Sequence, residues 1–235
     1  MSIALQVALV MVTILVVLLV IGAPIGVAIG MSSAVSMICM IPADVSFATS
    51  AQRIFAGSNS FSLIAIPFFI LAGNIMNNGG IATRLVNCAK VISGRMPGAL
   101  AQSNVVANML FGAISGSGAA AAAAMGGTIG PLEEKEGYDK NYSTAVNVAS
   151  APVGMLIPPS NTMIVYSSVA GSVSIAALFM AGYIPGFLWG GAVMILAGIM
   201  AKKRGYQAEQ RVPVKVALKT FWQAIPSLLL IVIVI

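Results

Sequence analysis

The sequence predicts an all-α polytopic membrane protein, and three features of its composition carry that prediction. Of the 235 residues, 59% are apolar and only 8% are charged, whereas a soluble domain has about 25% charged residues. Residues 1–43, 96–132 and 141–201 contain no charged side chain. Apolar stretches of this length favour helices that cross a lipid bilayer. The composition excludes a cytosolic enzyme, a disordered tail and a secreted disulfide scaffold.

The positive charges indicate which side of the membrane the loops face. The net charge is +6, and half of the twelve Lys and Arg residues lie between residues 202 and 219. Cytoplasmic loops of membrane proteins are rich in these residues, so we expect this segment to be cytoplasmic. Cations that flank apolar spans without interleaved aromatic residues do not indicate a nucleic-acid partner. The expected surroundings are membrane lipid.

Residues 1–100 are predicted to form scaffold helices and an interfacial arm helix. Between residues 81 and 91, apolar side chains recur at helical spacing opposite Arg84 and Lys90. This pattern is typical of an amphipathic helix lying at the membrane surface. The apolar runs that predict membrane-crossing helices in this part of the chain are residues 3–21, 25–41 and 61–76.

Residues 101–171 are predicted to form a transport domain, because two uncharged stretches within them are interrupted. The first stretch, 101–130, is broken by Ser115–Gly118, and each glycine within a helix costs about 1 kcal/mol. The second stretch, 143–171, is broken by Pro158-Pro159, which removes two backbone donors. Broken helices at membrane depth need a cover of protein or a water-filled cavity. They recur in ion-coupled secondary transporters.

Charge placement predicts that the first of these stretches is a re-entrant hairpin. The cationic segments 84–95, 135–140 and 202–219 should all lie on the cytoplasmic side. The stretch between the first two segments must therefore enter and leave on that side, and two half-length helices meeting at Ser115–Gly118 do so. The remaining predicted parts are a transmembrane helix (172–201), a basic cytoplasmic segment (202–223) and the start of a truncated transmembrane helix (224–235).

The predicted spans hold no charged side chain, and the chain has no histidine. This argues against a proton relay within the membrane, a transition-metal centre and a serine protease, because each needs an ionisable ligand or base. Uncharged hydroxyl and carbonyl oxygens suit a small hard cation such as Na⁺. We expect no catalytic residues and no cofactor besides Na⁺ as the coupling ion. The polar side chains near the two breaks are Ser115, Ser117, Ser160, Asn161 and Thr162.

Four motifs resemble those of one transporter family. They are Pro67-Phe68-Phe69-Ile70-Leu71-Ala72-Gly73, Ser115-Gly116-Ser117-Gly118, Ile157-Pro158-Pro159-Ser160 and Ala177-Leu178-Phe179-x-Ala181-Gly182-x-Ile184-Pro185-Gly186. Their order and spacing resemble the large membrane subunit of tripartite ATP-independent periplasmic (TRAP) transporters, the DctM type, over essentially the whole chain. The resemblance implies the first repeat of an inverted-repeat ion-transporter fold.

The resemblance implies a Na⁺-driven importer of organic acid anions such as dicarboxylates, sialic acid or sugar acids. It implies an elevator-type movement in the bacterial inner (cell) membrane. Two partners are implied, a small membrane subunit of the DctQ type and a periplasmic substrate-binding protein of the DctP type. By motif match, the family's Na⁺ site falls on Ser115, Gly116, Ser117, Gly118, Pro158, Pro159 and Ser160, with Asn161 and Thr162 as adjacent candidates for ion or substrate.

Two departures from the family pattern affect these expectations. The side-chain ligands that the family often carries after the hairpin tip are replaced here by Gly118 and the run Ala119–Ala124, so backbone carbonyls are expected to do more. The family's large subunit is about twice as long and contains two inverted repeats. We therefore expect this chain to hold the first repeat and not to transport by itself. The alternative is a membrane scaffold or assembly fragment without transport activity.

Overall fold

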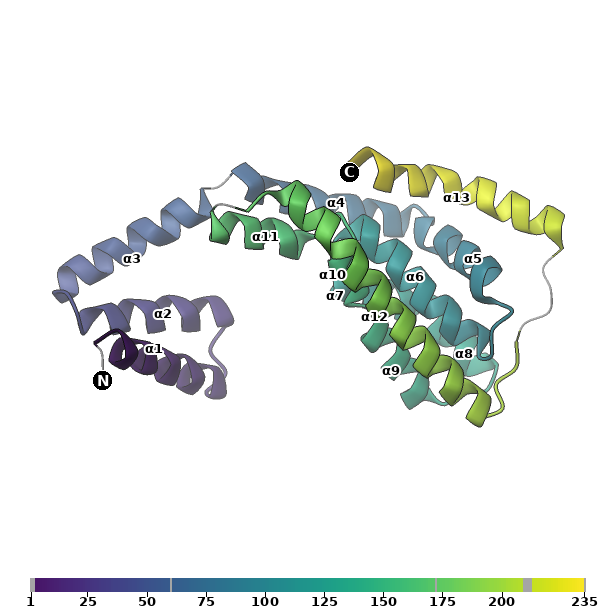
Figure 1. Ribbon diagram of the computed structural model, residues 1–235, viewed down its shortest axis with the longest axis horizontal. Coiled ribbons are helices and arrows are strands. Elements are labelled where there is room, and N and C mark those ends of the chain that lie inside the picture. Colours follow the sequence, from purple (N-terminus) through teal and green to yellow (C-terminus); the bar gives the residue numbers. More distant parts are fainter. Residues whose placement is uncertain (1–2, 60, 172, 209–212, 235) are drawn as a thin grey trace. The chain divides into compact units, whose positions relative to one another are not determined.

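The fold is given by a computed structural model that describes residues 3–59, 61–171, 173–208 and 213–234. Every regular element in these ranges is a helix, which confirms the all-α prediction. The chain divides into two compact units, Met1–Phe61 and Ser62–Ile235. Figure 1 labels the helices of both units, which are treated separately below.

The first unit consists of α1 (Ile3–Val20), α2 (Ile25–Ile38) and α3 (Ala43–Ser58). Gly22 lies between α1 and α2 in the left-handed conformation, with φ +88°, and Pro24 precedes the first residue of α2. These two residues end one helix and start the next, which confirms the predicted interruption. α1 has no buried residue, and its exposed apolar side chains suit contact with lipid.

The α-helices that follow α3 all belong to the second unit. In the described residues, α1 and the helix from Ile175 to Lys203 are long and apolar enough to cross a membrane. A third apolar segment, formed by Lys140–Leu156 and Asn161–Ala170, is bent by 49° at a break, as predicted. The bounds are η1 (Phe61–Ile64), α4 (Ala65–Asn78), α5 (Ile81–Ser93), α6 (Ala99–Ser115), α7 (Gly118–Thr128), α8 (Gly130–Lys135), α9 (Lys140–Ser150), α10 (Val153–Leu156), α11 (Asn161–Ala170), α12 (Ile175–Lys203) and α13 (Val214–Val234).

α6 forms the centre of the second unit. Nearly all of its residues are buried, and α5, α7, α9, α10 and α12 pack against it (Figure 1). Leu85 of α5 belongs to the same apolar core as Leu100 and Val105 of α6, whereas Arg84 is exposed. The amphipathic pattern of α5 therefore reflects packing on a neighbouring helix. The prediction that this helix lies at the membrane surface stays a prediction, because its packing on α6 gives no position relative to a bilayer.

α6 and α7 form a hairpin whose two outer ends lie at the same end of the unit. Gly98, which precedes α6, lies against Ala201 near the end of α12. Asn104 in α6 and Glu133 in α8 line one pocket. The chain therefore turns back at the tip near Gly116, in agreement with the reversal that the positive charges predict.

A cluster of aromatic and charged side chains joins the segments at that end, which we call the basic end. Arg204 forms an ion pair with Asp139, with 3.1 Å between Nη1 and Oδ1. The backbone N–H of Asp139 donates to the Tyr206 hydroxyl at 2.8 Å. The Tyr206 ring stacks on Tyr138, with 4.2 Å between ring centroids, and the Tyr142 hydroxyl donates to the backbone of α12.

Two structural boundaries lie within the predicted parts. α13 begins at Val214, so Lys215 and Lys219 lie within a helix. The division between the compact units falls after Phe61, because α4 and α5 pack with the hairpin. The assignment of these parts to scaffold, transport domain and cytoplasmic segment stays a prediction.

Candidate functional site

The tip of the hairpin is a two-residue break between α6 and α7. Gly116 follows α6 in the left-handed conformation, with φ +62°, which residues with a Cβ atom adopt only at a cost. Ser117 is extended and caps α7, because its hydroxyl accepts a hydrogen bond from the Ala120 N–H at 3.3 Å. The Gly-Ser sequence thus ends one helix and begins the next.

The second break lies between α10 and α11. Pro158 and Pro159 are buried there, and neither has an N–H that could continue a helix. Ser160 caps α11 by accepting a hydrogen bond from the Met163 N–H at 3.3 Å. The same hydroxyl donates to the carbonyl oxygen of Met155. Ser160 therefore ties the end of one helix to the beginning of the next.

The two breaks contact each other. The backbone N–H of Asn161 donates to the carbonyl oxygen of Gly116 at 3.3 Å. A Cβ atom placed on Gly116 would lie only 3.1 Å from the carbonyl oxygen of Pro159. The structure thus brings residues 115–118 and 158–161 together, and we call these residues the break site. Thr162, the other adjacent candidate, is exposed on α11.

Helix ends and uncharged oxygens determine the electrostatics of the break site. α7 and α11 begin here and α6 ends here, so terminal N–H groups and terminal carbonyl groups face the same region. The Oδ1 atom of Asn161 is buried and has no hydrogen-bond partner among the described residues. Among the residues that the structure describes, the Ser115 hydroxyl makes only long contacts of 3.4 Å, with the backbone of Ser117. Oxygens of this kind bind a cation through their dipoles, and no acid or base for catalysis lies among them.

Glycines bring the helices around the break site to backbone distance. A Cβ atom on Gly112 would lie 2.2 Å from the Cα atom of Gly154, so α6 and α10 touch backbone to backbone. On α4, a Cβ atom on Gly73 would lie 3.4 Å from the Cβ atom of Ser115. Sequence patterns did not point to Gly112 and Gly154, because an isolated glycine carries no periodic signal.

α12 supports the second break with a stripe of glycines. A Cβ atom on Gly182 would lie 2.3 Å from the carbonyl oxygen of Leu156, and one on Gly186 would lie 2.8 Å from a side-chain carbon of Ile157. Small residues let helices approach closely in membranes. These glycines therefore hold the end of α10 against α12, directly before the two prolines.

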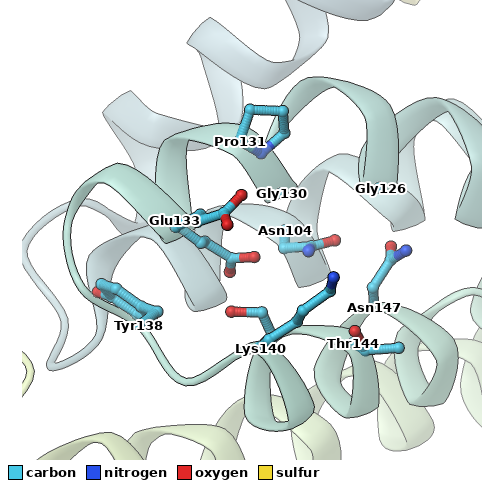
Figure 2. Close-up of a pocket in the computed structure, with 11 residues that line it drawn as sticks. Asn104, Gly126, Gly130, Pro131, Glu133, Tyr138, Lys140, Thr144 and Asn147 are labelled. Carbon is cyan, nitrogen blue, oxygen red and sulfur yellow. The ribbon is translucent and has the colours of Figure 1, made fainter.

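A second polar site, which the sequence did not indicate, lies at the other end of the hairpin. A pocket of about 360 Å³ is lined by residues of α6, α7, α8 and α9, and Figure 2 shows Asn104, Glu133 and Asn147 around it. Glu133 is only 1% exposed, although it lies in a charged segment. The spacing of residues in the sequence could have indicated this burial. Glu133 follows the buried residues Met125 and Ile129 at four-residue intervals, which is the spacing of one helix face.

Burial alters the ionisation of the Glu133 carboxyl group. Burial raises the pKa of Glu133 to about 7, because a charge is poorly solvated in such a place. The Ser143 hydroxyl and the Asn104 amide face the carboxylate and lower its pKa, but by less. By ordinary distance and angle limits, neither Glu133 oxygen has a hydrogen-bond partner among the described residues.

Sequence comparison identifies relatives that match most of the chain. The family "Tripartite ATP-independent periplasmic transporter, DctM component" matches residues 12–235. The uncharacterized protein YgiK of Salmonella typhimurium is 52% identical over 204 residues, which are 87% of this chain and 47% of that protein. The sialic acid TRAP transporter large permease protein SiaM of Vibrio cholerae is 38% identical over 190 residues, 79% of this chain and 43% of that protein. The C4-dicarboxylate TRAP transporter large permease protein DctM of Rhodobacter capsulatus is 36% identical over 200 residues, 80% of this chain and 46% of that protein.

The chain spans less than half the length of these curated relatives. The family match includes both the hairpin and the broken helix. The relatives with a named activity are transport permeases and not enzymes, and the apolar helices agree with a multi-pass protein of the inner membrane. The chain belongs to the DctM family, the DctM component of tripartite ATP-independent periplasmic transporters.

Proposed function

We propose that this chain forms part of the large membrane subunit of a Na⁺-coupled transporter that imports organic acid anions. The observation that carries this proposal is the contact between the two breaks, where the Asn161 N–H bonds to the Gly116 carbonyl at 3.3 Å. The contact gathers carbonyl, hydroxyl and amide oxygens in a region without a charged side chain. Secondary transporters bind coupling ions at broken helices of this kind.

The proposed Na⁺ ligands are oxygen atoms of the break site. Asn161 Oδ1 is buried without a partner, so a bound cation would compensate for its lost hydration. The weakly bonded Ser115 hydroxyl and the backbone carbonyls of Gly116 and Pro159 are further candidates. The Ser160 hydroxyl already caps α11, so its proposed role is to position the break. Gly118, whose added Cβ would lie 3.1 Å from the Ala151 carbonyl oxygen, is needed for close packing.

The substrate class is proposed from the relatives and from the helix ends. Relatives are named for sialic acid, C4-dicarboxylates and isethionate, and each of these is an organic acid. The N-termini of α7 and α11 at the break site favour an anionic group.

We include in the proposal delivery by a periplasmic binding protein of the DctP type, a small DctQ-type membrane subunit and an elevator-type movement. The word "tripartite" in the family's name supports the two partners.

Thermal unfolding of the intact chain in detergent tests the Na⁺ site. We expect Na⁺ to raise the unfolding midpoint relative to choline at equal ionic strength, because a ligand that binds the folded state stabilises it. The Asn161→Leu variant loses the unpartnered oxygen with little change in volume. We expect its apparent Na⁺ affinity to fall about tenfold or more, which corresponds to about 1.4 kcal/mol.

The neighbouring Thr162→Val variant is the matched control, because Thr162 is exposed and close in sequence. Its Na⁺ affinity should equal that of the unaltered chain. If Na⁺ and choline give the same midpoint for the unaltered chain, the proposed cation site fails and the scaffold alternative gains support. If the Asn161→Leu variant binds Na⁺ as tightly as the unaltered chain, Asn161 is not a Na⁺ ligand.

A further inference from the structure

We propose that the pocket around Glu133 is a proton-binding site at the cytoplasmic end of the hairpin. The proposal does not depend on Na⁺ binding, because the pocket and the break site lie at opposite ends of α6. The cytoplasmic assignment follows from the positive charges of the adjoining basic end, such as Lys202 and Lys203.

The geometry of the pocket leaves three polar groups facing one another without complete hydrogen bonds. Glu133 is 1% and Asn104 is 0% exposed, and both line the pocket together with Ser143. Both Glu133 oxygens, Asn104 Nδ2 and Ser143 Oγ have no hydrogen-bond partner among the described residues. A proton on Glu133 would supply an O–H donor for the Ser143 oxygen, and the other carboxyl oxygen could still accept from Asn104.

The charged and titratable groups around Glu133 favour a proton over a metal ion. Glu134 on the same helix and Lys140 on α9 are exposed and line the pocket, and Figure 2 shows the Lys140 amine extending toward Asn104 and Asn147. Tyr138 also lines the pocket, Tyr142 on α9 interacts electrostatically with Glu133, and α6 and α7 carry no charged side chain. The described residues contain no group of three or more acidic, His or Cys side chains suited to a metal. Lys140 is exposed, so water and salt screen its charge. A single buried carboxyl without further acidic ligands is a poor site for a metal ion, but it can bind a proton.

Loss of the proton has a structural consequence. The ionised carboxylate would lie one helical turn from the fully buried Ile129, and an unpaired buried charge is costly. Entry of water at α8 relieves that cost, so proton release loosens the packing of α8 on α6 and α9. Asn108 donates to pocket residues Asn104 and Asn147 at 2.9 and 3.0 Å, so this loosening reaches the interface between α6 and α9.

Infrared spectroscopy of the intact chain tests the proposal directly. The carbonyl band of a protonated carboxylic acid is followed while the pH is raised from about 4 to about 9, in the unaltered chain and in the Glu133→Gln and Glu134→Gln variants. We expect one band in the unaltered chain to disappear near pH 7 instead of near the ordinary value of 4.5. That band should be absent from Glu133→Gln and retained in Glu134→Gln.

Three outcomes would overturn the proposal. The first is that every carboxylic band of the unaltered chain disappears in the ordinary acidic range, a result that needs no variant to fold. The second is a neutral-range band that persists in Glu133→Gln. The third is a titration midpoint that moves when Na⁺ replaces choline at constant ionic strength, because the carboxylate would then hold a metal cation.

Discussion

The tip and the base of the hairpin both bury polar groups, and they do so with different chemistry. The tip uses backbone carbonyls and neutral side chains such as Asn161 and Ser115, without any charged group. The base buries the carboxyl group of Glu133. An unpaired charge is expensive in a buried place, and burial of a carboxyl favours its neutral, protonated form. The two ends therefore avoid a buried charge in different ways, the tip by neutral groups and the base by a group that can bind a proton.

The two ends also differ in how their neighbours approach. At the tip, glycines such as Gly112 and Gly154 allow backbone-to-backbone contact. At the base, side chains such as Asn104 and Asn147 line an open pocket and are linked through Asn108. A larger side chain should therefore lower stability most at the tip, and a change of charge should alter the pH dependence of stability most at the base.

The largest expected effect is that of Gly112→Leu. The new side chain begins at a Cβ position 2.2 Å from the Cα atom of Gly154, so α6 and α10 must separate. We expect a loss of about 3 kcal/mol of unfolding free energy and the loss of stabilisation by Na⁺, measured by thermal unfolding. Gly127→Ala in α7 is the control, because a Cβ atom there meets nothing within 4 Å. Full Na⁺ stabilisation in Gly112→Leu would show that the tip does not need this contact.

The next effect is the pH dependence of stability at the base. Below pH 4.5 Glu133 is protonated in both the folded and the unfolded chain, and between pH 4.5 and about 7 the unfolded chain loses the proton first. The stability contributed by the raised pKa is therefore lost as the pH rises through that window, by up to about 3 kcal/mol.

Unfolding midpoints measured across that pH range check this prediction. The Glu133→Gln variant should lose this component of the pH dependence and be more stable than the unaltered chain above pH 7. Glu134→Gln should keep the component, because Glu134 is exposed. If the unfolding midpoint of Glu133→Gln depended on pH as it does in the unaltered chain, Glu133 would not be the group that ionises in this range.

Smaller effects are expected from the two serine caps of the break site. Ser160 is 0% exposed and uses its hydroxyl both to cap α11 and to bond Met155, so Ser160→Ala should cost about 1–2 kcal/mol. Ser117 is only partly buried and makes one cap bond, so Ser117→Ala should cost about 0.5–1 kcal/mol. Denaturant unfolding measures both. If Ser117→Ala lost more unfolding free energy than Ser160→Ala, the cap at the hairpin tip would contribute more to stability than the cap at the second break.

The smallest effect is expected for Arg204→Gln at the basic end. Both partners of the Arg204–Asp139 ion pair are more than two-fifths exposed, and such pairs contribute little because water and salt screen them. The unfolding midpoint should change less than in either serine variant, and the change should shrink further in high salt. A neutral-range carboxylic band that shifts strongly in Arg204→Gln would show that Arg204 controls Glu133.

The sequence by itself determined the helical class, the two interruptions and the reversal of the chain between them. These features follow from local causes. Gly116 allows a left-handed backbone, Pro158 and Pro159 remove helix donors, and serines at the next helix starts provide caps. The distribution of Lys and Arg predicts that both ends of the hairpin lie on the same side of the membrane.

Only the tertiary structure decided which distant residues meet. The bond between Asn161 and Gly116, the contact of Gly112 with Gly154 and the burial of Glu133 each depend on how separate helices pack. The same holds for α5, whose apolar face covers other helices although its pattern alone is equally suited to a membrane surface. Hydrophobic periodicity shows that a face is buried but carries no information on what buries it, so these contacts had to be seen in three dimensions.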